Sequence, residues 1–236
     1  MLATRTKPDQ LRKLWHLLVW IQFRIFYRNR LGRNVLERVG NLELVVLPQV
    51  FNPRLFYTSA FLISQLDSDS IPSGSHVLDM GTGSGIGAVV AASLGSQVVA
   101  VDIAPDATRC ARINALLHQL EDRIEVRQGD LFAPVEGERF DIVLFNPPYF
   151  RGEPKDELDR AFRSQHVAAR FSEGLTEHLN PEGSALVVLS SNGEITTFLD
   201  EFASHGLAVE LIAEQDVINE VLKLFRLTAK TATKEL

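Results

Sequence analysis

Beyond residue 40, the chain alternates short apolar runs with longer segments in which apolar residues recur every three or four positions. The short runs predict strands at residues 41–47, 76–80, 97–101, 123–127, 140–145, 184–189, 207–213 and 221–228. The longer segments predict helices at residues 59–66, 86–94, 105–120, 157–179 and 194–205. Strands that alternate with helices are typical of parallel βαβ units. We therefore expect an α/β fold with a doubly wound, Rossmann-like, mostly parallel sheet of seven strands. The last two strands have no helix between them and should form an antiparallel pair at one edge.

Residues 1–40 differ from the rest of the chain in charge. They carry nine Lys or Arg against two acids, a net charge of +7, and the remaining residues carry −13 of the total of −6. We therefore expect two parts, a basic helical extension at residues 1–40 and one globular domain at residues 41–236. A basic arm on an acidic body suggests an anionic partner, although a solvated arm has the same composition.

The extension contains an amphipathic pattern between residues 11 and 27, where apolar residues repeat at three- and four-residue steps. Its longest uninterrupted apolar run, residues 17–21, is far shorter than the ~20 residues that a spanning helix needs. We expect no transmembrane segment. The pattern favours a helix packed on its own domain, and docking to RNA, a membrane surface or a partner is the alternative.

Composition narrows the class of protein further. The chain has 236 residues, of which 45% are hydrophobic and 23% charged, as expected of a soluble protein with one full core. The single cysteine, Cys110, excludes intrachain disulfides and multi-cysteine zinc sites and indicates a reducing, cytoplasmic compartment. The six histidines lack metal-ligand spacing, so we expect no metal.

The loop after the strand at residues 76–80 is rich in glycine: residues 79–87 read DMGTGSGIG. Glycines at its third, fifth and seventh positions permit a sharp turn and a close approach to a ligand. A dinucleotide fingerprint would need its third glycine at the position of Ile86, so that motif is absent. Asp79 precedes the glycines, and its negative charge suits a cationic ligand better than an anionic pyrophosphate.

Two more acids follow the next two strands. Asp102 lies where a carboxylate can accept hydrogen bonds from both hydroxyls of a ribose. Asp130 follows the third strand and could accept from an adenine amino group, with Leu131 against the ring. Each acid alone could be an ordinary turn or cap residue. Three acids at three successive strand ends suggest a ligand with a ribose, an adenine and a positive charge, and S-adenosylmethionine has all three.

The loop after the strand at residues 140–145 continues as Asn146-Pro147-Pro148-Tyr149. Two prolines donate no hydrogen bonds, so the loop offers acceptors: the side-chain carbonyl of Asn146 and the backbone carbonyls around Pro147. These acceptors suit a planar amino group, on which Tyr149 can stack. An Asn-Pro turn with an aromatic plug is the structural alternative, but the position at a strand end favours the acceptor site.

Together, VLDMGTGSGIG, VVAVDI, GDLF and LFNPPY resemble the class I S-adenosylmethionine-dependent methyltransferases of the HemK/PrmC type, which methylate the side-chain nitrogen of glutamine. The resemblance begins near Val45 and runs to the C-terminus. It implies that Asn146, Pro147, Pro148 and Tyr149 surround the acceptor nitrogen. It also implies cofactor contacts for Thr58, Asp79, Gly81, Thr82, Gly83, Gly85, Asp102, Ile103, Asp130, Leu131 and Asn146.

Residues 50–53 resemble a segment that lies over the active site in this family. The chain departs from this family in two places. Tyr57 stands where an acid usually precedes the threonine, so Thr58 matches only part of the family's motif. The N-terminal segment is also far shorter than the family's helical domain for release factors, which argues against a release factor as the substrate.

The sequence therefore predicts a methyltransferase that uses S-adenosylmethionine to methylate a planar amide or amino nitrogen, with a protein glutamine as the leading substrate. The alternatives are an adenine N6-methyltransferase that acts on RNA or DNA, a small-molecule N-methyltransferase, and a cofactor-binding scaffold without catalysis.

Overall fold

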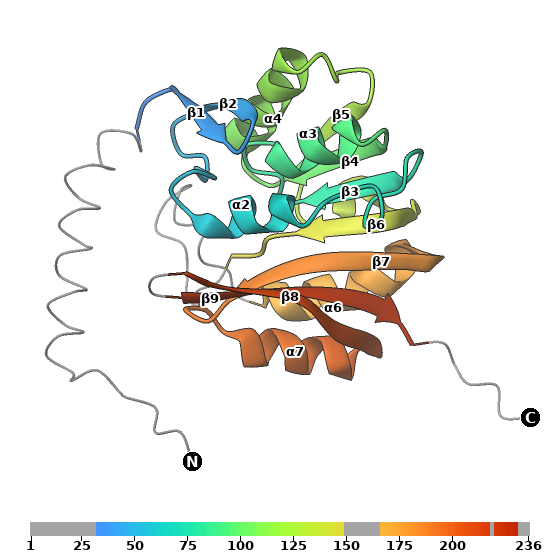
Figure 1. The fold of residues 1–236 in the computed structure, drawn as a ribbon. Helices are drawn as coiled ribbons and strands as arrows, with labels where there is room; N and C mark the ends of the chain where they lie inside the picture. The colour runs from blue at the N-terminus through green and yellow to red at the C-terminus, as the bar shows by residue number, and fades with distance from the viewer. Residues whose placement is uncertain (1–31, 149–165, 218–219, 231–236) are drawn as a thin grey trace, which may run out of the picture.

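A computed structural model of the protein describes residues 32–148, 166–217 and 220–230. The main feature of the fold is a seven-stranded sheet with the strand order β5-β4-β3-β6-β7-β9-β8 (Figure 1). The strands of this sheet are β3 (His76–Met80), β4 (Gln97–Asp102), β5 (Ile124–Gln128), β6 (Phe140–Phe145), β7 (Leu179–Ser190), β8 (Leu207–Val217) and β9 (Glu220–Ala229). The helices are α2 (Tyr57–Ser64), α3 (Ile86–Ser93), α4 (Pro105–Leu117), the 3-10 turn η2 (Ala133–Val135), α6 (Val167–His178) and α7 (Ile195–Ser204).

The directions of the strands confirm the predicted fold class. Strands β3 to β7 run parallel to one another, and β9 is antiparallel to both β7 and β8. The two final strands are therefore the expected antiparallel pair, with β8 at the edge. All five parallel strands direct their carboxyl ends to the same side of the sheet, where ligands bind in folds of this kind.

Helices cover both faces of the sheet (Figure 1). Apolar residues of α2, α3 and α4 pack on one face, and α6, α7 and η2 pack on the other. Side chains alternate between the faces along a strand, so Leu78 and Met80 of β3 lie on the α6 side while Val77 lies on the α3 side. The same alternation turns Asp79 toward α3.

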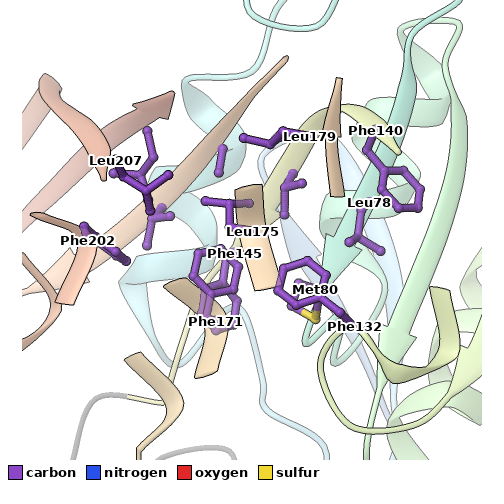
Figure 2. Packing of buried hydrophobic residues seen from close by; sticks show 14 of the residues in the cluster. Leu78, Met80, Phe132, Phe140, Phe145, Phe171, Leu175, Leu179, Phe202 and Leu207 are labelled. Carbon is purple, nitrogen blue, oxygen red and sulfur yellow. The ribbon is translucent and has the colours of Figure 1, made fainter. Parts of the chain in front are cut away.

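On the α6 side, aromatic rings form the centre of the core. Phe145, the last residue of β6, stacks on Phe171 of α6 with ring centroids 4.2 Å apart, and Figure 2 shows the two rings against each other. Phe171 also stacks on Phe132, which precedes η2. This packing anchors α6 beside the end of β6, where the predicted acceptor loop begins.

The structure corrects the prediction for residues 35–39. These residues form a strand, β1 (Val35–Val39), where a helical extension was expected. β1 pairs antiparallel with β2 (Leu42–Val46), and the expected division between residues 40 and 41 falls in the turn between them. Whether residues 1–40 and 41–236 are separate domains stays a prediction.

The hairpin of β1 and β2 lies beside α4. The side chain of Asn114 accepts a hydrogen bond from the backbone N–H of Val45 and donates to its carbonyl, at 2.8 and 2.7 Å. Asn114 also donates to the carbonyl of Ser84, and thus it joins the hairpin to the glycine-rich loop. Cys110, one turn earlier, is buried against the same hairpin, as a small apolar group would be.

Other boundaries also differ from the prediction, most of all those of β7 and α6. β7 begins at Leu179 rather than at residue 184, because a register shift at Phe140–Ile142 lets it pair earlier with β6. α6 starts at Val167, and the first part of the helix predicted at 157–179 lies outside the described residues. The amphipathic helix predicted at residues 11–27 also lies outside them. Within the described ranges, no helix is both long enough and apolar enough to cross a bilayer.

Candidate active site

Two adjoining cavities lie at the carboxyl ends of the parallel strands. The first, which we call the glycine-loop cavity, has a volume of about 130 Å³. Its lining includes Asp79, Gly81, Gly83, Ser59 and Asn146. The second, the Asp130 cavity, has a volume of about 180 Å³. Both are lined by Met80, Gly81, Asp102, Ile103, Phe145 and Pro148. The loops after β3, β4, β5 and β6 therefore border one elongated space.

The glycine-rich loop after β3 needs its glycines for two different reasons. Gly81 and Gly83 line the cavity with φ values of +65° and +54°, a left-handed conformation that side chains disfavour. Gly85, at φ +82°, packs against α4, and a Cβ there would lie 2.9 Å from the Cα of Ala111. The loop can therefore come close both to a ligand and to the helix behind it.

Asp79 is the buried acid of this site, with an exposed fraction of 6%. Its Oδ2 atom accepts a hydrogen bond from the hydroxyl of Thr82 at 2.5 Å and one from the backbone N–H of Ala88 at 2.9 Å. Burial raises the pKa of Asp79 to about 6, and the negative charge of Asp102 adds to this rise, while the bonds from Thr82 and Ala88 oppose it. Asp79 is therefore largely ionised at pH 7 and places a negative charge beside the cavity.

Asp102 connects the first two strand-end loops. Its Oδ2 atom accepts from the backbone N–H of Gly83 at 2.9 Å, and its Oδ1 atom accepts from that of Ala104 at the same distance. These bonds hold the glycine-rich loop against the end of β4. A carboxylate has about four acceptor positions, so Asp102 has the capacity to accept ligand hydroxyls as well.

Asp130 and Leu131 line the far end of the Asp130 cavity. The turn that holds them is bonded on both sides, from Gly129 N–H to the carbonyl of Asp102 and from Ala133 N–H to the carbonyl of Asp130. Leu131 has a φ of +48°. The side chain of Arg170, from α6, donates to Oδ2 of Asp130 at 2.8 Å. The walls of this cavity are otherwise mostly apolar: Met80, Val101, Ile103, Leu131, Phe145, Pro148 and Val167.

Asn146 lines the glycine-loop cavity at the end of β6, and two hydroxyls of α2 hold its amide. Its Nδ2 atom donates to the hydroxyl of Ser59 at 3.0 Å and to that of Thr58 at 3.3 Å. The carbonyl oxygen of the amide is thereby turned away from these hydroxyls. Thr58 itself is buried and bonds to Asn146, while its neighbour Ser59 reaches the cavity wall.

The structure thus brings together most of the residues singled out from the sequence. The following residues line one or both cavities: Asp79, Gly81, Thr82, Gly83, Asp102, Ile103, Asp130, Leu131, Asn146, Pro147 and Pro148. Gly85 and Thr58 support this set from behind. Tyr149 lies outside the described residues.

Sequence reasoning missed several residues of the cavity walls. Gln49, Val50 and Phe51 follow β2 and line the glycine-loop cavity, and Arg170 lines the Asp130 cavity. The segment at 50–53 was noted for its likeness to the family's active-site segment, so a signal existed for two of these residues. Arg170 lies within a helix and carries no local signal.

The residues present fit S-adenosylmethionine. Gly81 and Gly83 line the cavity in a left-handed conformation that side chains disfavour, and the acids suit an ammonium group and ribose hydroxyls. The apolar walls beside Asp130 suit an adenine ring.

Comparison with known proteins agrees with this geometry. The model of the methyltransferase small domain family matches residues 41–217. A release factor glutamine methyltransferase of Geobacter sulfurreducens is 32% identical over 70% of this chain and 61% of its own length. A ribosomal RNA small subunit methyltransferase C of Alcanivorax borkumensis is 32% identical over 72% of this chain and 49% of its own length.

A similar fold occurs in solved structures. The 16S rRNA N2 G1207 methyltransferase of T. thermophilus, in complex with AdoMet and guanosine, superposes with a TM-score of 0.63 at 22% identity, over 84% of this chain and 50% of the other. The sheet, its helical layers and this similarity define a Rossmann-like methyltransferase fold. The chain belongs to the methyltransferase small domain family. It spans about half the length of the curated relatives it matches.

Proposed function

We propose that this chain is an S-adenosylmethionine-dependent N-methyltransferase, and that its acceptor is the side-chain amide of a glutamine in a protein. The observation that carries the proposal is the single elongated space at the strand ends. Three acids, a left-handed glycine loop and the Asn146-Pro147-Pro148 segment all border it.

The chemistry at each end of the elongated space indicates which part of the cofactor would bind there. The negative charge of Asp79 and the close backbone of Gly81 and Gly83 suit the methionine portion, which carries an ammonium group. Asp102 would accept from the ribose hydroxyls, and its bond to Gly83 N–H holds the glycine loop in place before the cofactor arrives. Asp130 would accept from the adenine amino group, with Leu131 against the ring.

Asn146 would position the acceptor nitrogen. Ser59 and Thr58 hold its Nδ2 atom and so fix the orientation of the amide, whose carbonyl oxygen would accept an N–H of the substrate. The backbone carbonyl of Pro147 is a second candidate acceptor. An amide nitrogen is a poor nucleophile because its lone pair is delocalised, so alignment by these acceptors is the main contribution of the protein.

The bound cofactor supplies an electrophilic methyl group on a sulfonium. A new N–C bond forms as the C–S bond breaks, S-adenosylhomocysteine leaves, and the extra proton on nitrogen passes to solvent. No general base is required before the transfer.

A protein substrate is favoured by charge and by similarity. Residues 41–236 carry a net charge of −13, which opposes binding to a phosphate backbone. Several relatives are glutamine methyltransferases, among them the ribosomal protein uL3 enzyme of Bradyrhizobium diazoefficiens at 35% identity over 51% of this chain. The second candidate is an exocyclic amine of a nucleic acid base, because the similarity to ribosomal RNA methyltransferase C covers 72% of the chain.

A single incubation separates the two candidates. The full chain is mixed with S-adenosylmethionine labelled in its methyl group and with cell extract, and portions are digested with protease or with nuclease. We expect the label to become soluble on protease treatment only. Release by nuclease only would favour the nucleic acid substrate, and no incorporation above that of the Asn146→Ala variant would contradict the proposed activity.

A further inference from the structure

The ion pair between Arg170 and Asp130 lies at the wall of the Asp130 cavity. The two side chains are 50% and 46% exposed, and one guanidinium nitrogen is 2.8 Å from Oδ2 of Asp130. An exposed pair of this kind contributes little to stability, typically ~0.2–1 kcal/mol. Both residues line the same cavity, so a role in ligand binding accounts for the pair better than a role in folding.

The backbone on both sides of the pair is well anchored. Arg170 precedes Phe171, a fully buried residue that stacks on Phe145 at the end of β6. Val167, one turn earlier on α6, lines the same cavity. The first turn of α6 therefore forms part of the cavity wall, and the core holds it at a fixed distance from the strand ends.

Asp130 is anchored in a similar way. The amide of Gly129 donates to the carbonyl of Asp102, and the carbonyl of Asp130 accepts from Ala133, so the main chain of the turn is bonded on both sides. These bonds fix the backbone but leave the carboxylate to rotate. Among the described hydrogen bonds, the one that engages this carboxylate comes from Arg170.

We infer that Arg170 is a positioning residue for purine recognition: by engaging Oδ2 of Asp130, it turns Oδ1 to accept from the 6-amino group of the adenine. The inference rests on the proposed function. The two oxygens of a carboxylate lie in one plane, so a guanidinium on one oxygen sets the direction of the other.

A carboxylate held in this way should prefer a 6-amino purine to a 6-oxo purine. A 6-amino group donates to a carboxylate oxygen, whereas the 6-oxo group of hypoxanthine would meet it with a lone pair. A carboxylate held in one orientation discriminates between the two, and a carboxylate free to rotate discriminates less.

The test compares S-adenosylhomocysteine with its 6-oxo analogue, S-inosylhomocysteine, by titration calorimetry on the full chain. We expect the wild type to bind the amino compound roughly tenfold or more tightly, as for one hydrogen bond to a charged group. Arg170→Met should reduce that ratio to about threefold or less, mainly by weakening the amino compound. Arg170→Lys keeps a cationic donor and should give an intermediate ratio.

Arg109→Met is the matched control. Arg109 also forms an exposed pair with an aspartate, Asp106, at 3.1 Å, but neither residue lines the two cavities. This variant should keep the wild-type ratio, and all variants should melt within a few degrees of the wild type.

Two results would overturn this inference but leave the proposed function intact. One is a wild-type ratio of the two affinities in Arg170→Met, and the other is an equal loss of affinity for both compounds in that variant. An Arg170→Lys ratio no better than that of Arg170→Met would contradict the role of the charge. Failure of the wild type to bind S-adenosylhomocysteine at all would instead remove the proposed function, and the inference with it.

Discussion

Replacement of Asp79 by Asn should stabilise the protein and weaken its cofactor binding at the same time. Asn has nearly the shape of Asp but no charge. Both hydrogen bonds that Asp79 accepts, from Thr82 and Ala88, end on the same oxygen, so the amide oxygen of Asn can keep both. The variant therefore removes the buried charge with little change in packing.

The size of the effect follows from the pKa of Asp79, which burial raises from 3.8 to about 6. Below pH 3.8 the carboxyl is protonated in both the folded and the unfolded chain, and the charge costs nothing. Between pH 3.8 and 6 the unfolded chain ionises first, so the folded chain holds more protons and its stability falls as pH rises. Above pH 6 the full cost of about 3 kcal/mol is present.

Denaturant unfolding at pH 5, 6, 7 and 8 measures this cost. We expect the advantage of Asp79→Asn to grow between pH 5 and 7 and to level off near 3 kcal/mol. Asp106→Asn is the control, because it removes the same charge from an exposed position and should show little change. An Asp79→Asn variant no more stable than the wild type at pH 7 would refute the reasoning.

Ionisation of Asp79 lowers the stability of the fold but should strengthen cofactor binding. The affinity of the wild type for S-adenosylmethionine should rise as pH increases through about 6, because Asp79 becomes ionised. The affinity of Asp79→Asn should be lower at pH 7 and should lack this rise. Titration calorimetry across the same pH range measures both, and a parallel pH dependence in the two proteins would assign the rise to another group.

Three further substitutions test other parts of the site. Asp102→Ala should weaken S-adenosylmethionine binding roughly 10- to 100-fold in titration calorimetry, because hydrogen bonds to a charged group are lost. Unchanged affinity would disprove the role of Asp102 in cofactor binding. Gly87→Ala places a Cβ 2.7 Å from Oδ1 of Asp79, so we expect the free energy of unfolding to fall by about 1–3 kcal/mol in denaturant titration. Wild-type stability would contradict that contact. Ser59→Ala removes one of the hydroxyls that hold Asn146 and should lower the rate of methyl transfer by about tenfold. The affinity for S-adenosylhomocysteine should stay within about twofold of the wild-type value. Equal losses in rate and affinity would indicate a structural role instead.

The strand ends could be predicted from the sequence because their signals are local. β3, β4 and β6 are mostly buried and largely apolar runs, and a glycine or a proline follows each of them within three residues. The acids at the ends of β3 and β4 and after β5 were therefore assigned to one edge of a sheet, and the structure brings them to two adjoining cavities.

The strand at residues 35–39 was missed because a charged residue interrupts its apolar pattern. Glu37 lies on the inner face of β1 with an exposed fraction of 3%, between Val35 and Val39. Its carboxylate accepts a hydrogen bond from Asn52 and pairs with Arg54. These partners lie 15 and 17 positions away, and nothing in the local sequence marks them as partners.

Side-chain pairs that join distant elements were missed for the same reason. Ser59 and Asn146 are 87 positions apart, and Asp130 and Arg170 are 40 apart. Each member of a pair looks like an ordinary polar residue of a helix or a turn. The contacts exist only because α2 and α6 pack beside the strand ends.

The most direct test of the proposed site is a crystal structure of the full chain with S-adenosylhomocysteine. We expect one molecule to span both cavities, with its amino acid portion beside Gly81, its ribose hydroxyls within hydrogen-bond distance of Asp102 and its 6-amino group at Asp130. A ligand bound elsewhere on the protein, or no bound ligand at saturating concentration, would contradict the site.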